Sequence, residues 1–72
     1  MKTNLKALRT EAGLTQADLA AKIGVSRQAV IAIESDKHDP SLDLAYRIAA
    51  VFDLPVEVIF ENPHRSSAAT TE

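Results

Sequence analysis

Arg27 and Gln28 stand side by side in the chain, and Ile31 and Ala32 follow them four residues later on the same helical side. Arginine can make two hydrogen bonds to a guanine, and glutamine can make two to an adenine, in the major groove of B-form DNA. Short aliphatic groups can touch thymine methyls there. The spacing therefore predicts a surface that reads DNA bases, and the alternative interpretation is an ordinary solvated helix face.

A link of three residues, Gly24-Val25-Ser26, joins this segment to an earlier predicted helix over 16–23. Thr15 and Asp18 form a capping-box-like start for the earlier helix, and Ser26 is a good N-cap for the next one, predicted over 27–35. So short a link holds two helices at a steep angle, which is typical of a helix-turn-helix unit. Val25 is expected to pack into the core from that turn.

Apolar periodicity predicts three further helices, over 4–12, 42–52 and 55–60. Gly13 fits the left-handed position after the first of them, Ser41 the N-cap of the second, and Pro55 the first residue of the third. Residues 62–72 carry no large apolar side chain and are expected to form a disordered tail. The fold class is therefore all-α, with five helices in one domain over residues 1–61.

The composition excludes several kinds of site. The chain of 72 residues has no cysteine, and its two histidines, His38 and His64, lie in different parts of the sequence, so no metal site is expected. Nothing resembles an acid–base pair or an activated nucleophile, so neither an enzyme nor a cofactor is expected. The longest apolar runs have five residues, whereas a membrane helix needs about 20. The lack of cysteine fits a reducing, cytoplasmic location, and no signal peptide is visible.

Four stretches, in this order and at this spacing, resemble the lambda-repressor/Cro type of DNA-binding domain, the XRE family. They are LTQADLA at 14–20, IGVSRQAV at 23–30, Ile33-Glu34, and Pro40-Ser41-Leu42. The resemblance covers about Leu5 to Phe60. It implies a small transcriptional regulator, expected to be a repressor, that binds operator DNA as a homodimer with its third helix in the major groove.

The resemblance also implies roles for single residues. Gln16 is expected to hold a phosphate and to brace Gln28, and Arg9 is expected to form a structural ion pair with Glu34. The expected base contacts are Arg27, Gln28, Ile31 and Ala32, and the expected contacts to the DNA backbone are Thr15, Gln16, Ser26, Lys37 and His38. Asp36 departs from the family pattern, because glycine is common at this place.

The last predicted helix suggests how two copies would meet. Val56 and Ile59 continue an inward stripe from Phe52, whereas Val58 and Phe60 fall off it and are expected to be exposed in a monomer. A twofold dimer would cover them. The expected interface is Phe52, Val56, Val58, Ile59 and Phe60.

Charge is the main argument for a competing interpretation. Residues 15–38 carry three basic and three acidic side chains, which sum to zero, and affinity for DNA depends on positive charge. The alternative is a protein-interaction module on the same fold, such as an antitoxin or an anti-repressor partner. Residues 1–47 sum to +1 and residues 48–72 to −3, which favours DNA contact through the first part of the chain. No membrane or small-molecule effector is expected, and Tyr46 is expected to be partly buried.

Overall fold

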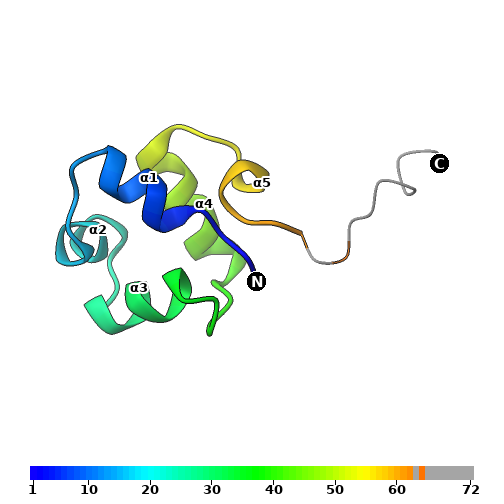
Figure 1. Ribbon diagram of the computed structural model, residues 1–72, viewed down its shortest axis with the longest axis horizontal. Helices are drawn as coiled ribbons and strands as arrows, with labels where there is room; N and C mark the ends of the chain where they lie inside the picture. The colour runs from blue at the N-terminus through cyan, green and yellow to red at the C-terminus, as the bar shows by residue number, and fades with distance from the viewer. Residues whose placement is uncertain (63, 65–72) are drawn as a thin grey trace.

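The computed structural model describes residues 1–62 and 64, and these residues form the predicted all-α fold (Figure 1). The helices are α1 (Leu5–Glu11), α2 (Gln16–Ile23), α3 (Arg27–Glu34), α4 (Leu42–Phe52) and α5 (Val56–Ile59). The bounds of α2 and α4 agree with the prediction, and the other three helices are shorter by one or two residues. Most of the predicted tail, residues 63 and 65–72, lies outside the described residues. No helix in the described part is long and apolar enough to cross a membrane.

Side-chain caps fix where the helices begin. The hydroxyl of Thr15 accepts a hydrogen bond from the backbone N–H of Asp18, and the carboxylate of Asp18 accepts one from the backbone N–H of Thr15, both at 2.9 Å. The hydroxyls of Ser26 and Ser41 each accept a backbone N–H at the start of α3 and α4. These bonds satisfy N–H groups that have no partner within a helix, which is why the sequence predicts these starts well.

The short turn between α2 and α3 depends on one glycine. Gly24 ends α2 with a φ of 74°, in the left-handed region where a side chain is strained. Val25 follows and packs, half-buried, against the core, as the sequence predicts. The turn therefore joins α2 to α3 within three residues, and the two helices pack against each other.

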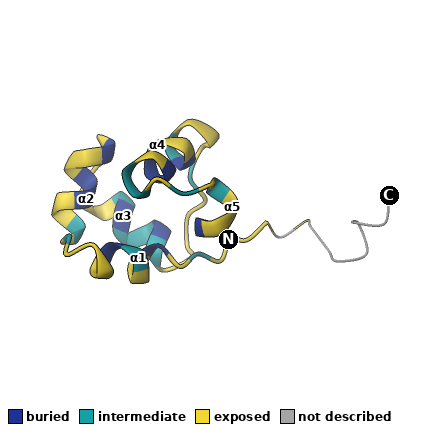
Figure 2. Cartoon of the chain, turned by 90° about the horizontal axis from the view of Figure 1, so that it is seen from above, coloured by how far each residue is buried: buried dark blue, intermediate teal, exposed yellow. Residues whose placement is uncertain are grey.

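The core lies between the inner faces of the five helices, and Figure 2 shows their buried portions turned toward one another. Its buried apolar residues are Leu5, Leu19, Ala20, Ile23, Val30, Ile33, Ala45, Ile48, Ala49, Ile59 and Phe60. Burial of each large side chain contributes about 1.5–3 kcal/mol before the entropy cost of ordering the chain. The core therefore fixes which face of α3 points outward.

The N-terminal segment holds α5 in place through backbone hydrogen bonds. Asn4 donates its backbone N–H to the carbonyl of Ile59 at 3.2 Å, and Glu61 donates to the carbonyl of Lys2 at 2.9 Å. Thr3 and Phe60 form an antiparallel β-bridge. We call this pairing of residues 2–4 with residues 59–61 the terminal clasp.

Two details predicted for the last helix are wrong. Pro55 is the N-cap of α5 and not its first residue, and Phe60 has already left the helix with extended backbone angles. Because an extended residue turns its side chain by a different angle from a helical one, Phe60 points inward and is 4% exposed. The expectation that Phe60 is exposed in a single copy is wrong.

Within residues 1–62 and 64, two residues other than glycine have left-handed backbone angles. Asp36 has a φ of 63° in the loop between α3 and α4, and Asp53 has a φ of 54° at the end of α4. Aspartate tolerates this region better than most residues, and glycine tolerates it best. The glycine that the family often has at the place of Asp36 is thus explained by the backbone conformation of this loop.

Candidate nucleic-acid interface

The outer face of α3 presents the residues predicted to read bases. Arg27 and Gln28 occupy the first turn and are exposed, whereas Ile31 and Ala32 are half-buried. On the opposite face, Val30 is 0% and Ile33 is 1% exposed, so the helix cannot rotate without unpacking the core. Two long hydrogen-bonding side chains therefore stand in solvent at the amino end of a rigidly held helix.

The amino end of α2 lies beside α3 and carries Thr15 and Gln16. Thr15 is exposed, and its hydroxyl belongs to the capping box. Gln16 is half-buried, and its Nε2 donates to Oε1 of Glu34 at 3.3 Å. Within the described residues no hydrogen bond joins Gln16 to Gln28, so the expected bracing of Gln28 is absent from this structure.

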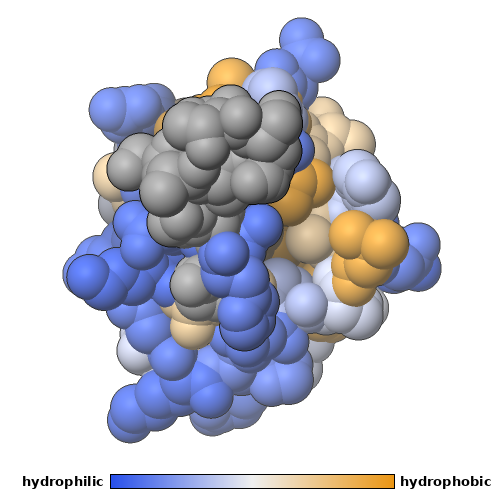
Figure 3. Space-filling view, turned by 90° about the vertical axis from the view of Figure 1, so that its right-hand side faces the viewer, coloured by the Kyte–Doolittle hydropathy of each residue, from blue (hydrophilic) through white to orange (hydrophobic). Residues whose placement is uncertain are grey.

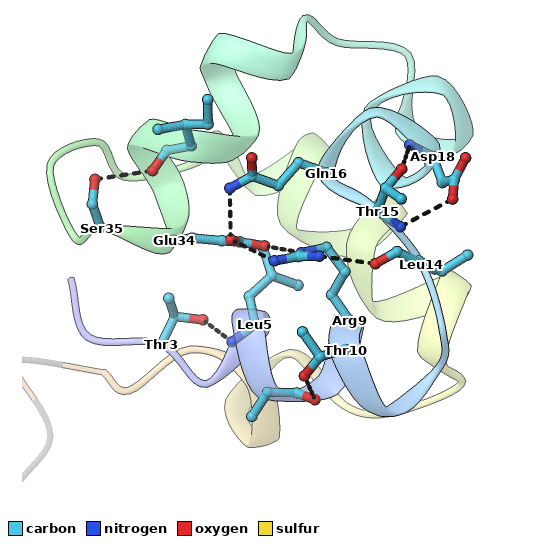
Figure 4. A network of polar contacts seen from close by, with 12 residues as sticks. Thr3, Leu5, Arg9, Thr10, Leu14, Thr15, Gln16, Asp18, Glu34 and Ser35 are labelled. Carbon is cyan, nitrogen blue, oxygen red and sulfur yellow. Dashed lines mark hydrogen bonds and ion pairs between the residues drawn. The ribbon is translucent and has the colours of Figure 1, made fainter.

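Glu34 is the centre of a buried polar network that Figure 4 shows from close by. Arg9 donates from Nε to Oε2 of Glu34 at 2.6 Å and from Nη2 to Oε1 at 3.3 Å. Its Nη1 donates to the backbone carbonyl of Leu14 at 2.8 Å. The two side chains are 9% and 5% exposed. The ion pair expected between them is present, and it ties α1 to the end of α3 and to the segment that leads into α2.

This pairing changes the charge that the site presents. The formal charges of residues 15–38 sum to zero only if Glu34 is counted as a charge exposed to solvent. Arg9, which lies outside that stretch, neutralises Glu34 in the buried ion pair. With Arg9 included, four basic and three acidic side chains give a net charge of +1. The surface is therefore less unfavourable for a polyanion than the sequence count suggests.

Asp18 also has its charge satisfied locally. Its pKa lies below the ordinary value, chiefly because the backbone N–H of Thr15 donates to the carboxylate, with smaller contributions from the Thr15 hydroxyl and from Lys22.

The remaining predicted contacts to the DNA backbone are all exposed, and they are Ser26, Lys37 and His38. Lys37 and His38 lie in the loop after α3. The structure therefore leaves each of these side chains free to meet a ligand.

Arg47 on α4 contributes a contact that the sequence does not reveal. Its Nη1 donates to the carbonyl of Ile23, the last residue of α2, at 3.3 Å, and its Nε pairs with Asp43 at 2.9 Å. A cation at this position satisfies a helix-end carbonyl beside the turn that aims α3. The spacing of Asp43 and Arg47 could have indicated their pairing, but the contact to Ile23 joins residues 24 apart.

Exposed apolar side chains lie on α4 and α5. Tyr46 is 60% exposed, which contradicts the expectation of partial burial, and Leu42, one turn earlier on α4, is 69% exposed. Of the five residues expected in a dimer interface, Val58 is 50% exposed, Phe52 and Val56 are half-buried, and Ile59 and Phe60 are buried. Among the described residues there is no cluster of three or more metal-ligating side chains.

Comparison with known proteins relates the chain to one family. The chain matches the family described as "Helix-turn-helix" over residues 5–59. An HTH-type transcriptional regulator of Methanocaldococcus jannaschii is 57% identical over 60 residues, which cover 83% of this chain and 91% of that protein.

Two solved structures have folds similar to that of this chain. The restriction-modification controller protein C.AhdI of Aeromonas hydrophila has a TM-score of 0.71 at 32% identity, over 78% of this chain and 85% of that one. The biofilm master regulator SinR, in complex with DNA, has a TM-score of 0.67 at 31% identity, over 74% of this chain and 86% of that one.

Proposed function

Because the chain belongs to the helix-turn-helix family of DNA-binding transcriptional regulators, which are not enzymes, we propose that it is a sequence-specific repressor that binds double-stranded operator DNA as a homodimer. The observation that carries this proposal is the first turn of α3, where Arg27 and Gln28 are exposed beyond the Ser26 cap. Their side chains supply the hydrogen bonds that distinguish guanine and adenine in the major groove.

Base contact by these two residues is tested by selecting bound sequences from a random duplex pool. Arg27→Ala and Gln28→Ala should each lose about 1–3 kcal/mol of discrimination at one position of the enriched site. Both side chains are exposed, so the circular dichroism melting curve should stay unchanged. If Gln28→Ala enriches the same sequence as the unmodified chain with the same preference, the assigned role of Gln28 is wrong.

Backbone contacts position the protein on DNA without reading sequence. The Ser26 hydroxyl accepts the Ala29 N–H, which leaves its own hydrogen for a phosphate oxygen. Gln16 has a second N–H besides the one given to Glu34. Thr15, Lys37 and His38 are exposed around these two residues in the proposed footprint.

A pair of substitutions at Ser26 separates the phosphate contact from the cap. Asparagine and aspartate are both good N-caps, so both variants should fold, but only Ser26→Asp brings a negative charge to the phosphate. Ser26→Asp should weaken binding to every duplex alike, and Ser26→Asn should bind nearly as the unmodified chain does. Equal affinities for the two variants would place Ser26 away from the DNA backbone.

The repressor part of the proposal needs only occupation of DNA, and the homodimer part rests on the exposure of Val58. Repression needs only that a bound protein occupies DNA that the polymerase must use, whereas activation needs a further contact with the polymerase. A twofold dimer would repeat the contacts of α3 on two half-sites about one DNA turn apart. Val58 is the exposed apolar residue of α5, so Val58→Asp should lower the cooperativity of binding to a palindrome, whereas a Phe60 variant would unpack the core.

A second candidate function is a protein-interaction module on the same fold. The observation that favours it is the exposure of Leu42 and Tyr46, which lie one turn apart on α4. The salt dependence of binding separates the two candidates. The logarithm of the DNA affinity should fall linearly with the logarithm of the salt concentration, by about 0.9 for each phosphate neutralised. If no duplex binds in the selection at low salt, the DNA-binding proposal fails.

A further inference from the structure

The carbonyl of Ile23, at the end of α2, takes its hydrogen bond from another helix. Gly24 and Val25 both donate their backbone N–H groups to the carbonyl of Ala20. Within the described residues no backbone N–H reaches the carbonyl of Ile23, as is usual for the last carbonyls of a helix. Instead, Nη1 of Arg47 on α4 donates to it at 3.3 Å. The orientation of the peptide group between Ile23 and Gly24 therefore depends on a side chain of α4.

This peptide group adjoins the most flexible residue of the turn. Gly24 has a φ of 74° and no side chain, so its backbone can rotate more freely than that of any other residue type. Rotation about the bonds beside this peptide group changes the angle between α2 and α3. Val25 holds one side of the turn by packing against the core, and Arg47 holds the other side through the Ile23 carbonyl.

Arg47 is itself held in a fixed direction. Its Nε pairs with Oδ2 of Asp43, one turn earlier on α4, at 2.9 Å. Its Nη1 lies 3.5 Å from the place that a Cβ on Gly24 would occupy, so the guanidinium covers the open side of the glycine. The buried face of α4 anchors this helix in the core. The side chain of Arg47 is 56% exposed, so it acts on the turn more through directed hydrogen bonds than through burial.

Within residues 1–62 and 64, the other long-range polar contacts hold different parts of the molecule. Arg9 binds Glu34 at the end of α3 and the carbonyl of Leu14 before α2. The terminal clasp lies at the end of the molecule opposite to the turn, which Figure 3 shows with hydrophobic residues exposed beside hydrophilic ones. The contact of Arg47 is the one that lies at the end of α2, beside the start of α3. The start of α3 is also the part that carries the proposed base contacts.

We propose that Arg47 is a positioning residue for base recognition. By holding the Ile23 carbonyl, it fixes the direction in which the first turn of α3 presents Arg27 and Gln28. This inference rests on the proposed DNA-binding function and adds a residue that acts without touching a base. Hydrogen bonds weaken steeply as they depart from linearity, so a small rotation of α3 lowers discrimination at both base positions together.

A direct contact between Arg47 and a phosphate is the competing explanation, and it predicts a different result. The side chain is exposed enough to reach a phosphate. Loss of a phosphate contact lowers the affinity for every duplex alike and reduces the salt slope by about 0.9. Loss of the positioning contact lowers the affinity for the preferred sequence more than for other sequences, and it leaves the number of phosphate contacts unchanged. The same titrations therefore separate the two roles.

The test replaces Arg47 in two ways. Arg47→Met keeps a side chain of similar length without charge or donors, and Arg47→Lys keeps the charge and N–H donors. Lys6→Met at an exposed position of α1 is the matched control, because it removes one positive charge away from the turn. Each variant is titrated below its melting temperature, over a range of salt concentrations. The duplexes are the enriched one and those changed at the positions read by Arg27 or Gln28.

Arg47→Met should lose roughly three- to tenfold of the preference for the enriched sequence at both positions, with the same salt slope as Lys6→Met. Arg47→Lys should keep most of the preference, and Lys6→Met should keep all of it. A lower melting temperature with an unchanged preference would make Arg47 a structural residue only. An equal loss on every duplex with a reduced salt slope would make it a phosphate contact. Either of these two results overturns the proposal.

Residual dipolar couplings of the backbone N–H groups test the same inference without DNA. They report the angle between α2 and α3 in the free protein, which Arg47→Met should change and Arg47→Lys should largely preserve. If Arg47→Met has the same angle as the unmodified chain, the positioning role is overturned whether or not a duplex binds. A changed angle in a chain that binds no duplex supports the hold of Arg47 on α3 and overturns the DNA-binding proposal alone.

Discussion

Replacing Arg9 with methionine removes one partner of a buried ion pair and keeps a side chain of similar length. Glu34 is 5% exposed and would lose the two N–H groups of Arg9, and the Leu14 carbonyl would lose its donor. Breaking such a pair from one side costs about 3–5 kcal/mol, because a charge stays buried without a counter-charge. A chain of 72 residues has a total stability of roughly 4–11 kcal/mol. Arg9→Met is therefore expected to remove about a quarter or more of the free energy of unfolding.

The double variant Arg9→Met/Glu34→Leu is the informative comparison. Replacing both charges with apolar side chains is often neutral or stabilising, apart from about 1 kcal/mol for the Leu14 carbonyl. Urea unfolding followed by circular dichroism at 222 nm gives the stability of all four proteins of the cycle, with Glu34→Leu as the other single variant. The coupling energy should exceed about 2 kcal/mol. Coupling below about 0.5 kcal/mol would mean that the two side chains are solvated independently, and the reasoning from burial would be refuted.

Three further predictions follow from the backbone angles and caps. Asp36→Gly should raise the free energy of unfolding by about 0.5–1 kcal/mol by relieving a left-handed φ. It should also strengthen DNA binding, because it removes a negative charge. Asp53→Gly is the matched control, which should raise the melting temperature by a similar amount and leave the DNA affinity unchanged. Asp18→Asn should flatten the loss of stability below about pH 4. A carboxyl with a lowered pKa stabilises the fold above its unfolded-state pKa, and this contribution is lost as the pH falls through its folded-state pKa. An acid-unfolding curve identical to that of the unmodified chain would contradict this. Gly24→Ala should cost about 1 kcal/mol or more by chemical denaturation through its φ of 74°, since an added Cβ meets nothing closer than 3.5 Å.

Features of the fold that depend on neighbours in sequence could be predicted. Thr15, Ser26 and Ser41 begin their helices where the sequence places them, because a cap is satisfied within three residues. The outward position of Arg27 and Gln28 follows from the same logic, since the inward stripe of α3 determines its outer face.

Features that depend on distant partners could not be predicted from periodicity. Phe60 lies off the helical stripe in sequence, but its bridge to Thr3, across the whole chain, makes its backbone extended and buries its side chain. Tyr46 is exposed because Ala45, Ile48 and Ala49 already form the buried face of α4, and its aromatic character does not change that geometry. The Gln16–Glu34 bond likewise joins two helices and has no local signal.

The terminal clasp also indicates in which order parts of the chain fold. Its bond from Thr3 to Ile59 joins residues 56 apart, whereas the turn between α2 and α3 closes within three residues. Closing a long loop costs more chain entropy and is compensated only after the intervening helices have packed. The helix-turn-helix is therefore expected to form first, and the clasp afterwards. Substitutions at Ile59 should then mainly accelerate unfolding and leave the folding rate nearly unchanged, so that α5 is the first helix to open and the last to close.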